Sequence, residues 1–201
     1  TYKAKLIVLE GIDGTGKTTT ANKLKEHYEQ QGKKVFLYYE PYKFASFDVK
    51  QIIKDLETQG NIVPDFAILN LMIANRDISV NNILIPALNE YDIVIADRYY
   101  YSTYAYQWRI FNDIISLELP FHRINKSYPA PNKVIFFKVK DLETYQNNQS
   151  DNFEIQDLSK FKEIQREYKN AFNTLDSVFE FTESYNPELI IIEVDQNKES
   201  Y

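Results

Sequence analysis

The stretch Gly11-Ile-Asp-Gly-Thr-Gly-Lys-Thr18 decides the fold of this chain. It matches the phosphate-loop pattern G-x-x-x-x-G-K-[ST] at every position. An apolar run, Lys5–Leu9, precedes it, and a run compatible with a helix opens at Lys17. A strand, a glycine-rich loop and a helix in this order are the context that the pattern requires. The sequence therefore predicts a phosphate loop rather than a glycine-rich helix cap.

Each residue type in this loop has a chemical reason to be there. Glycines allow the backbone to curl so that successive N–H groups face a phosphate. Lys17 supplies a mobile cation for the β- and γ-phosphates of a nucleotide, and the hydroxyl of Thr18 suits Mg²⁺. The residues predicted to contact ATP are Gly11, Ile12, Asp13, Gly14, Thr15, Gly16, Lys17, Thr18 and Thr19.

Short apolar runs alternate with helical patterns along the rest of the chain. The runs are nearly continuous in apolar character, as buried parallel strands are; they cover Lys5–Leu9, Val35–Tyr39, Ile93–Ala96, Val134–Val139 and Leu189–Val194. The segments long enough for crossover helices are Lys17–Gln31, Phe47–Gln59, Pro64–Asn89 and Leu158–Glu180. This order predicts one α/β domain over residues 1–201. We expect a P-loop NTPase three-layer sandwich: a five-stranded parallel sheet, helices on both faces and a short lid near residues 141–159.

Composition excludes several function classes. The chain has 201 residues, enough for one domain with a substantial core, and it has no Cys. Its two histidines, His27 and His122, lie far apart, which argues against a metal centre built on Cys or His. A net charge of −6 argues against general nucleic-acid binding. No run approaches the length of a membrane span, and the first residues do not form a signal peptide. We therefore expect a cytoplasmic protein without nucleic-acid or membrane partners.

A second group of polar residues follows the third predicted strand. Asp97 and Arg98 stand at its carboxyl end, where open α/β sheets bind ligands. A guanidinium there can hold phosphate oxygens bidentately, and Asp97 can hold Mg²⁺ through water or fix Arg98. The alternative is an ordinary ion pair that ends the strand. Tyrosines crowd behind this pair, and their rings can either stack on a base or pack the sheet against a helix; they are Tyr99, Tyr100, Tyr101, Tyr104 and Tyr106.

Four blocks of this sequence resemble the thymidylate kinase family in order and spacing. They are Leu9–Thr20, Glu40-Pro41, Ala74-Asn-Arg76 and Asp97–Gln107, and the resemblance runs from residue 5 to about residue 195. The family phosphorylates dTMP to dTDP with ATP and Mg²⁺, typically as a homodimer. The resemblance implies that Lys17, Arg98 and Asp13 are catalytic and that Thr18 and Asp97 hold the metal. The helical segment that contains Phe66, Leu69 and Ile73 can serve the core or a dimer seam.

The same resemblance implies a set of residues around the acceptor nucleotide. Asp13 would face the 3′-hydroxyl of the sugar, and Arg76 would lie near the pyrimidine base and the acceptor phosphate. The structural alternatives are an Asx turn at Asp13 and a solvated helix position for Arg76. The implied acceptor-binding set is Asp13, Glu40, Pro41, Lys43, Met72, Arg76, Arg98, Ser102, Tyr106 and Gln107.

Three departures from the family pattern bear on function. Tyr39 stands where an arginine commonly contacts the acceptor phosphate, and Lys43 is a candidate replacement for that charge. Met72 stands where phenylalanine often stacks on thymine. The predicted lid, residues 141–159, has no Lys or Arg, whereas one arginine at the transferred group is worth about 10³–10⁵ in rate. Candidates to supply that charge are Arg109, Arg123, Lys140 and Lys160.

These features predict transfer of the γ-phosphate of ATP to a deoxynucleoside monophosphate, with dTMP as the first choice. Tyr39 and Met72 keep open a kinase of the same fold for a modified or different nucleotide or nucleoside. The uncharged lid keeps open a nucleotide-binding interaction module with weakened catalysis. A GTPase is disfavoured because the sequence has no Asn-Lys-x-Asp segment.

Overall fold

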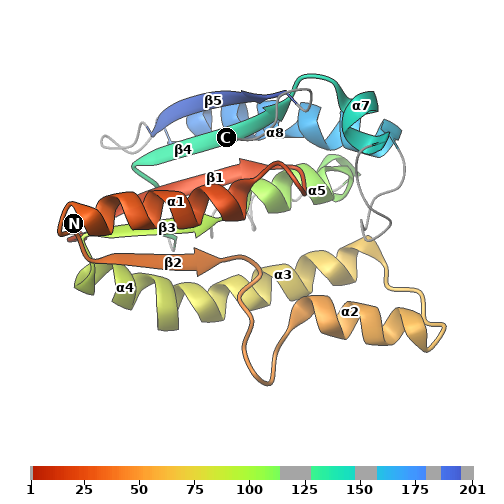
Figure 1. Ribbon diagram of the computed structural model, residues 1–201. Helices are drawn as coiled ribbons and strands as arrows, with labels where there is room; N and C mark the ends of the chain where they lie inside the picture. The colour runs from red at the N-terminus through yellow and green to blue at the C-terminus, as the bar shows by residue number, and fades with distance from the viewer. Residues whose placement is uncertain (1, 114–127, 148–157, 180–186, 196–201) are drawn as a thin grey trace.

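A parallel sheet lies between two layers of helices (Figure 1). The computed structural model describes residues 2–113, 128–147, 158–179 and 187–195. The five strands run in the order β2-β3-β1-β4-β5 and all adjacent pairs are parallel. Their bounds are β1 Lys5–Gly11, β2 Val35–Tyr39, β3 Ile93–Asp97, β4 Lys133–Val139 and β5 Glu188–Val194. The predicted three-layer fold is confirmed, and each predicted strand differs by two residues or fewer at an end.

Helices follow most strands, as predicted. Their bounds are α1 Lys17–Gln30, α2 Val49–Thr58, α3 Asp65–Ser79, η1 Val80–Leu84, α4 Ile85–Glu90, α5 Tyr100–Asp113, α7 Leu142–Asn147 and α8 Leu158–Phe179. The long segment predicted at Pro64–Asn89 is a helical run with a π-helical turn, η1, between α3 and α4. Helices α5 and α7 were not predicted, because the Tyr-rich stretch before Asp113 has weak helix propensity and no clear apolar period. Within the described residues, no helix is both long and apolar enough to cross a membrane.

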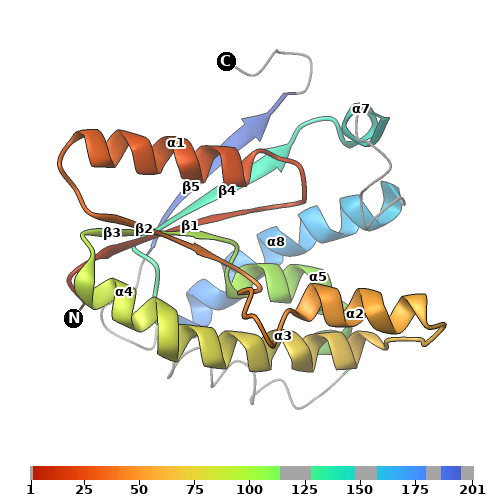
Figure 2. The same ribbon diagram turned by 60° about the horizontal axis from the view of Figure 1, so that its bottom comes forward.

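Successive side chains of each strand point to opposite faces of the sheet, and apolar side chains form a core on both faces. Leu9 and Ile95 point to the face covered by α1, whereas Val8 and Val94 point to the face covered by α4, α5 and α8 (Figure 2). Burial of apolar surface on both faces explains why the central strands are apolar at nearly every position.

Strand β5 departs from the predicted burial. Ile191 is 56% exposed, and Leu189 and Ile192 are each 39% exposed. The reason is position: β5 is an edge strand that pairs only with β4, and α1 packs over β1, β2 and β3. An apolar run is therefore a good predictor of a strand here but not of a strand buried on both faces.

Candidate active site

The phosphate loop starts where β1 ends, at the carboxyl edge of the sheet. Gly11 has φ +144, and a Cβ added there would lie 2.7 Å from the carbonyl oxygen of Phe137. Only glycine fits this close approach between β1 and β4. The parallel register places Leu9 opposite Asp97 on β3, so the loop and Asp97 share one edge. This is the edge at which open α/β sheets bind ligands.

Lys17 lies over the loop that it follows. Its ammonium donates to the carbonyl oxygen of Ile12 at 2.6 Å, and the Oγ1 of Thr15 lies 3.5 Å away. The side chain is buried, and burial together with the charge of Arg98 lowers the pKa of Lys17 to about 8. The loop therefore holds a desolvated cation in a position where phosphate oxygens gain most from it.

Thr18 and Asp97 meet in the structure as the metal prediction requires. The hydroxyl of Thr18 donates to Oδ2 of Asp97 at 2.5 Å, and both residues line the same cavity. One hydroxyl and one carboxylate are hard oxygen donors, and Mg²⁺ in nucleotide sites uses one or two such groups together with phosphates and water. Among the described residues, no cluster of three or more His, Cys, Asp or Glu is arranged to hold a metal without a substrate.

Arg98 is held by partners from three elements. Its Nη2 pairs with Asp13 and donates to the hydroxyl of Tyr106 at 3.1 Å. Its Nη1 donates to Ser102 at 2.9 Å and to Tyr168 at 3.0 Å. Arg98 thus pairs with Asp13 across the site, and the alternative of an ordinary Asp97–Arg98 ion pair at the strand end is wrong.

The charge of Asp13 is stabilised by its neighbours. Burial alone would raise the pKa of this carboxyl, but Arg98, Lys17 and Lys50 lower it overall. Asp13 is thus an anion inside a phosphate loop, balanced by nearby cations. The observed partner is the guanidinium of Arg98, so the Asx-turn alternative is not needed to explain the residue.

A cavity of about 530 Å³ opens between the phosphate loop, β2 and β3. It is lined by Asp13, Gly14, Gly16, Lys17, Thr18, Thr19, Tyr39, Glu40, Pro41, Lys50, Asp97 and Arg98. Most of these residues were predicted, and they come from four separate parts of the chain. The volume falls in the range of small-molecule sites.

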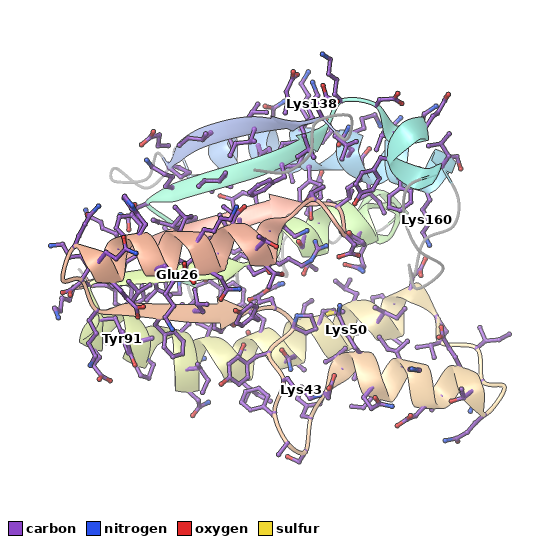
Figure 3. The ribbon with its side chains drawn as sticks, viewed as in Figure 1. Glu26, Lys43, Lys50, Tyr91, Lys138 and Lys160 are labelled. Carbon is purple, nitrogen blue, oxygen red and sulfur yellow. The ribbon has the colours of Figure 1, made fainter. Side chains whose placement is uncertain are left out.

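Lys50 lines this cavity, whereas Lys43 does not. Figure 3 shows Lys43 on the loop before α2 and Lys50 on α2 itself. The side chain of Lys43 is 83% exposed and pairs with Asp48 at 3.3 Å. Sequence reasoning missed Lys50 because it considered only the lysine nearest to the Glu40-Pro41 block. A lysine at the start of a helix that follows that block was the available signal.

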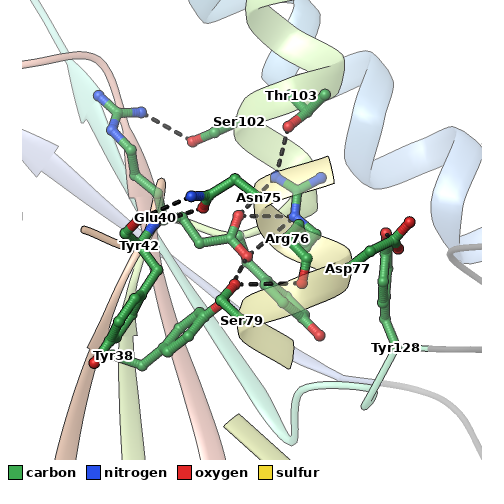
Figure 4. A network of polar contacts seen from close by, with 12 residues as sticks. Tyr38, Glu40, Tyr42, Asn75, Arg76, Asp77, Ser79, Ser102, Thr103 and Tyr128 are labelled. Atoms are coloured by element: carbon green, nitrogen blue, oxygen red, sulfur yellow. Dashed lines mark hydrogen bonds and ion pairs between the residues drawn. The ribbon is translucent and has the colours of Figure 1, made fainter. Parts of the chain in front are cut away.

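Arg76 and Glu40 form a buried ion pair behind the cavity wall (Figure 4). Nε of Arg76 donates to both carboxylate oxygens at 3.0 and 2.8 Å, and Nη2 donates to Oε2 at 2.6 Å. Nη2 also donates to the hydroxyl of Thr103 at 2.6 Å. Each side chain is 5% exposed. The solvated position considered for Arg76 is therefore wrong.

The neighbouring Asn75 fixes the loop that follows Glu40. Its side-chain amide accepts from the N–H of Tyr42 and donates to the carbonyl of Tyr42, both at 2.8 Å. This two-way contact joins α3 to the loop after β2. The Ala74-Asn-Arg76 block thus positions the Glu40-Pro41 block through two adjacent side chains.

The other predicted acceptor residues divide between site and surroundings. Ser102 and Tyr106 contact Arg98, while Met72 lies half-buried on α3. Gln107 lies where the helical geometry of α5 is interrupted, with φ −111 and ψ 17. Among the tyrosines behind Asp97, those buried in the core are Tyr99, Tyr100 and Tyr101.

Residues 148–157 of the predicted lid lie outside the described residues, and the part before them contains α7, Leu142–Asn147. Arg123 and the side chain of Arg109 also lie outside the described part of the structure. Lys140 and Lys160 are exposed, at the two ends of this segment. The identity of the cation that faces the transferred phosphate therefore stays a prediction.

Comparison with known proteins agrees with this geometry. The family model described as thymidylate kinase matches residues 9–190. A probable thymidylate kinase of Pyrococcus abyssi is 33% identical over 175 residues, which is 86% of this chain and 83% of the relative. Probable thymidylate kinase 1 of Saccharolobus solfataricus is 34% identical over 174 residues, 84% and 85% of the two chains. A thymidylate kinase of Desulfotalea psychrophila is 37% identical over 110 residues, 55% and 53% of the two chains.

Proposed function

The chain belongs to the thymidylate kinase family and is an ATP-dependent kinase of dTMP, and from this premise we propose which of its residues bind each substrate. The comparisons favour neither a kinase for another acceptor nor a module without catalysis. The observation that carries the assignment is the cavity in which Lys17, Arg98 and Lys50 meet beside the phosphate loop.

ATP binds along the loop from Gly11 to Thr19. Backbone N–H groups of the loop and the start of α1 face its phosphates, and Lys17 neutralises the β- and γ-phosphates. Thr18 and Asp97 are the residues that would hold Mg²⁺, which supplies charge neutralisation of the phosphates when bound. Their contact at the cavity wall supports this part of the proposal.

The acceptor monophosphate binds between Arg98 and Lys50. These two cations face the cavity from the end of β3 and from α2. Lys50 thus takes the place of the arginine that Tyr39 replaces. Asp13 holds the sugar, and Glu40, fixed from behind by the buried Arg76, is part of the wall against which the nucleotide rests. Met72, Ser102, Tyr106 and Gln107 remain predicted acceptor contacts.

Catalysis in this site needs alignment and charge neutralisation rather than a general base. The attacking oxygen belongs to a phosphate and is already anionic near neutral pH. Lys17 and Arg98 line the same cavity and offset the charge that develops on the transferred group. Exclusion of water prevents transfer of the phosphate to water.

The assay that tests this proposal measures ADP release with ATP, Mg²⁺ and a panel of deoxynucleoside monophosphates. We expect dTMP to be the best acceptor. Lys50→Gln should raise KM for dTMP about 10- to 100-fold, because a hydrogen bond to a charged group is lost. Lys43→Gln, on the exposed loop, serves as the matched control and should leave KM nearly unchanged. A large effect at position 43 and none at position 50 would reverse the assignment.

We further propose that the protein is a homodimer that pairs through α3. Phe66 is 55% exposed and Ile62, just before the helix, is 91% exposed. Ile73 lies seven residues after Phe66, on the same face of α3, and is half-buried. Leu69 is buried and belongs to the core. Light scattering should give the molar mass of a dimer for the wild-type protein and that of a monomer for Phe66→Glu. Gln30→Glu, on α1, is the control and should still give the molar mass of a dimer.

A further inference from the structure

Glu10 is a fully buried carboxylate next to the phosphate loop. Its Oε1 accepts from the backbone N–H of Tyr99 at 2.8 Å and from that of Ser102 at 3.3 Å. Its Oε2 accepts from the hydroxyl of Ser102 at 2.6 Å. Glu10 does not line the cavity, so it does not reach a substrate there. All three donors belong to the segment that immediately follows Arg98.

The backbone of Arg98 needs such support. Its φ is +72, a left-handed conformation that costs about 1–2 kcal/mol for a residue with a side chain. A residue stays in this region only where its surroundings fix it. The N–H of Arg98 donates to the carbonyl of Leu9 at 2.9 Å, and the next N–H, that of Tyr99, donates to Glu10. Leu9 and Glu10, which are consecutive at the end of β1, therefore bind the N–H groups of two consecutive residues of the turn.

Ser102 connects Glu10 to the guanidinium of Arg98 by hydrogen bonds. Its hydroxyl donates to Glu10 and accepts from Nη1 of Arg98 at 2.9 Å. Tyr168 of α8 contacts both Nη1 of Arg98 at 3.0 Å and Oγ of Ser102 at 2.8 Å. A continuous set of hydrogen bonds therefore runs from the buried carboxylate to the cation that faces the cavity.

We propose that Glu10 is a positioning residue for Arg98: it fixes the left-handed turn through Tyr99 and orients the guanidinium through Ser102. Burial raises the pKa of Glu10 to about 7, so the side chain is mostly ionised above that pH. In this form its charge strengthens both contacts, because hydrogen bonds to an ionised acceptor are about twice as strong as neutral ones. This inference rests on the proposed role of Arg98 in phosphoryl transfer.

A purely structural role would give a different result. Glu10 also accepts from N–H groups at the start of α5, so its removal could weaken the fold without touching Arg98 in particular. A structural defect lowers activity by the same factor whether or not Arg98 is present. A positioning defect disappears when Arg98 is already absent, because nothing is left to position.

The test is a double-mutant cycle of Glu10→Gln and Arg98→Gln, measured as kcat and KM with ATP, Mg²⁺ and dTMP. Glu10→Gln keeps the shape of the side chain and removes its charge. We expect kcat to fall about 10- to 100-fold, as misplacement of a catalytic group does, while KM for ATP stays within about twofold. In the Arg98→Gln background the further loss should be less than twofold. Glu26→Gln, on the exposed face of α1, is the control and should leave both constants unchanged.

Each outcome bears on the proposal. Equal losses in the two backgrounds, or unchanged kcat in Glu10→Gln, would overturn it. If Glu10→Gln does not fold, Glu10→Asp takes its place in the same cycle, since the shorter side chain keeps the charge but draws the carboxylate away from Tyr99 and Ser102. The proposed function fails separately, when the wild-type protein does not phosphorylate dTMP or when Arg98→Gln alone has no effect.

Discussion

Replacement of Arg76 by methionine should destabilise the protein strongly, because it leaves the Glu40 carboxylate buried without its partner. Glu40 receives three hydrogen bonds from Arg76 and one from the hydroxyl of Tyr38 at 3.3 Å. Removal of one partner of a buried pair costs about 3–5 kcal/mol. A domain of this kind is stable by only about 5–15 kcal/mol, so the change is a large share of the total.

The double variant Arg76→Met/Glu40→Gln sharpens the same prediction. It removes the buried charge together with the lost partner, and replacement of both members of a buried pair is often nearly neutral. We therefore expect it to recover at least half of the loss seen in Arg76→Met. Urea denaturation followed by circular dichroism gives the free energy of unfolding for each variant.

An exposed ion pair provides the control. Lys138 and Glu193 lie 3.5 Å apart, with side chains 47% and 58% exposed, so Lys138→Met should leave the free energy of unfolding almost unchanged. A loss in Arg76→Met no larger than that in Lys138→Met would contradict this prediction. Simple addition of the losses from Arg76→Met and Glu40→Gln would contradict it too, because the effects of coupled neighbours do not add.

Three further predictions concern Lys17, Glu10 and Gly11. Because the pKa of Lys17 is lowered to about 8, the charged fraction of Lys17 falls as pH rises through 8. ATP binding near pH 8.5 should therefore take up a proton, which titration calorimetry detects as a binding heat that depends on the buffer. An equal heat in all buffers would contradict this. Burial raises the pKa of Glu10 from 4.5 to about 7, so the folded protein binds a proton at Glu10 that the unfolded chain releases as pH rises. The free energy of unfolding of the wild-type protein should therefore fall by about 3 kcal/mol between pH 4.5 and 7, relative to that of Glu10→Gln. Parallel curves of unfolding free energy against pH for the two proteins would exclude this. Gly11→Ala places a Cβ 2.7 Å from the carbonyl oxygen of Phe137, whereas the Cβ of Gly60→Ala meets nothing within 4 Å. Thermal melts should therefore show a much larger decrease in melting temperature for Gly11→Ala than for Gly60→Ala. Equal decreases would mean that the phosphate loop relaxes around the new Cβ without cost.

The sequence predicted the sheet and the phosphate loop because both depend on local patterns. Apolar runs such as Ile93–Ala96 and the glycine spacing of residues 11–18 are properties of consecutive residues. It did not predict that Arg98 pairs with Asp13 or that Arg76 pairs with Glu40. Those partners are 85 and 36 residues apart in the chain, and only the tertiary fold brings them together: the sheet places Arg98 beside the phosphate loop, and the packing of α3 places Arg76 beside Glu40.

The residues that were missed share one physical cause. Lys50 and Glu10 carry charges whose role depends on where an element ends or begins in space. Lys50 lies outside the four family blocks, and Glu10 lies within the first block but outside the phosphate-loop pattern of residues 11–18. Tyr168 lies in a charge-rich helix, where its contact with Arg98 depends on the face of α8 that turns inward. The burial of β5 was overestimated because an edge strand and a central strand can have the same composition.

The contact between Asp13 and Arg98 sets a condition on what the site can accept. In the free protein these two charges pair with each other, so an anion that binds Arg98 competes with the carboxylate of Asp13. In the proposed binding mode, a nucleotide brings a phosphate for the guanidinium and a sugar hydroxyl for the carboxylate in one molecule. We therefore expect inorganic phosphate alone to bind at Arg98 more weakly than a nucleoside monophosphate does.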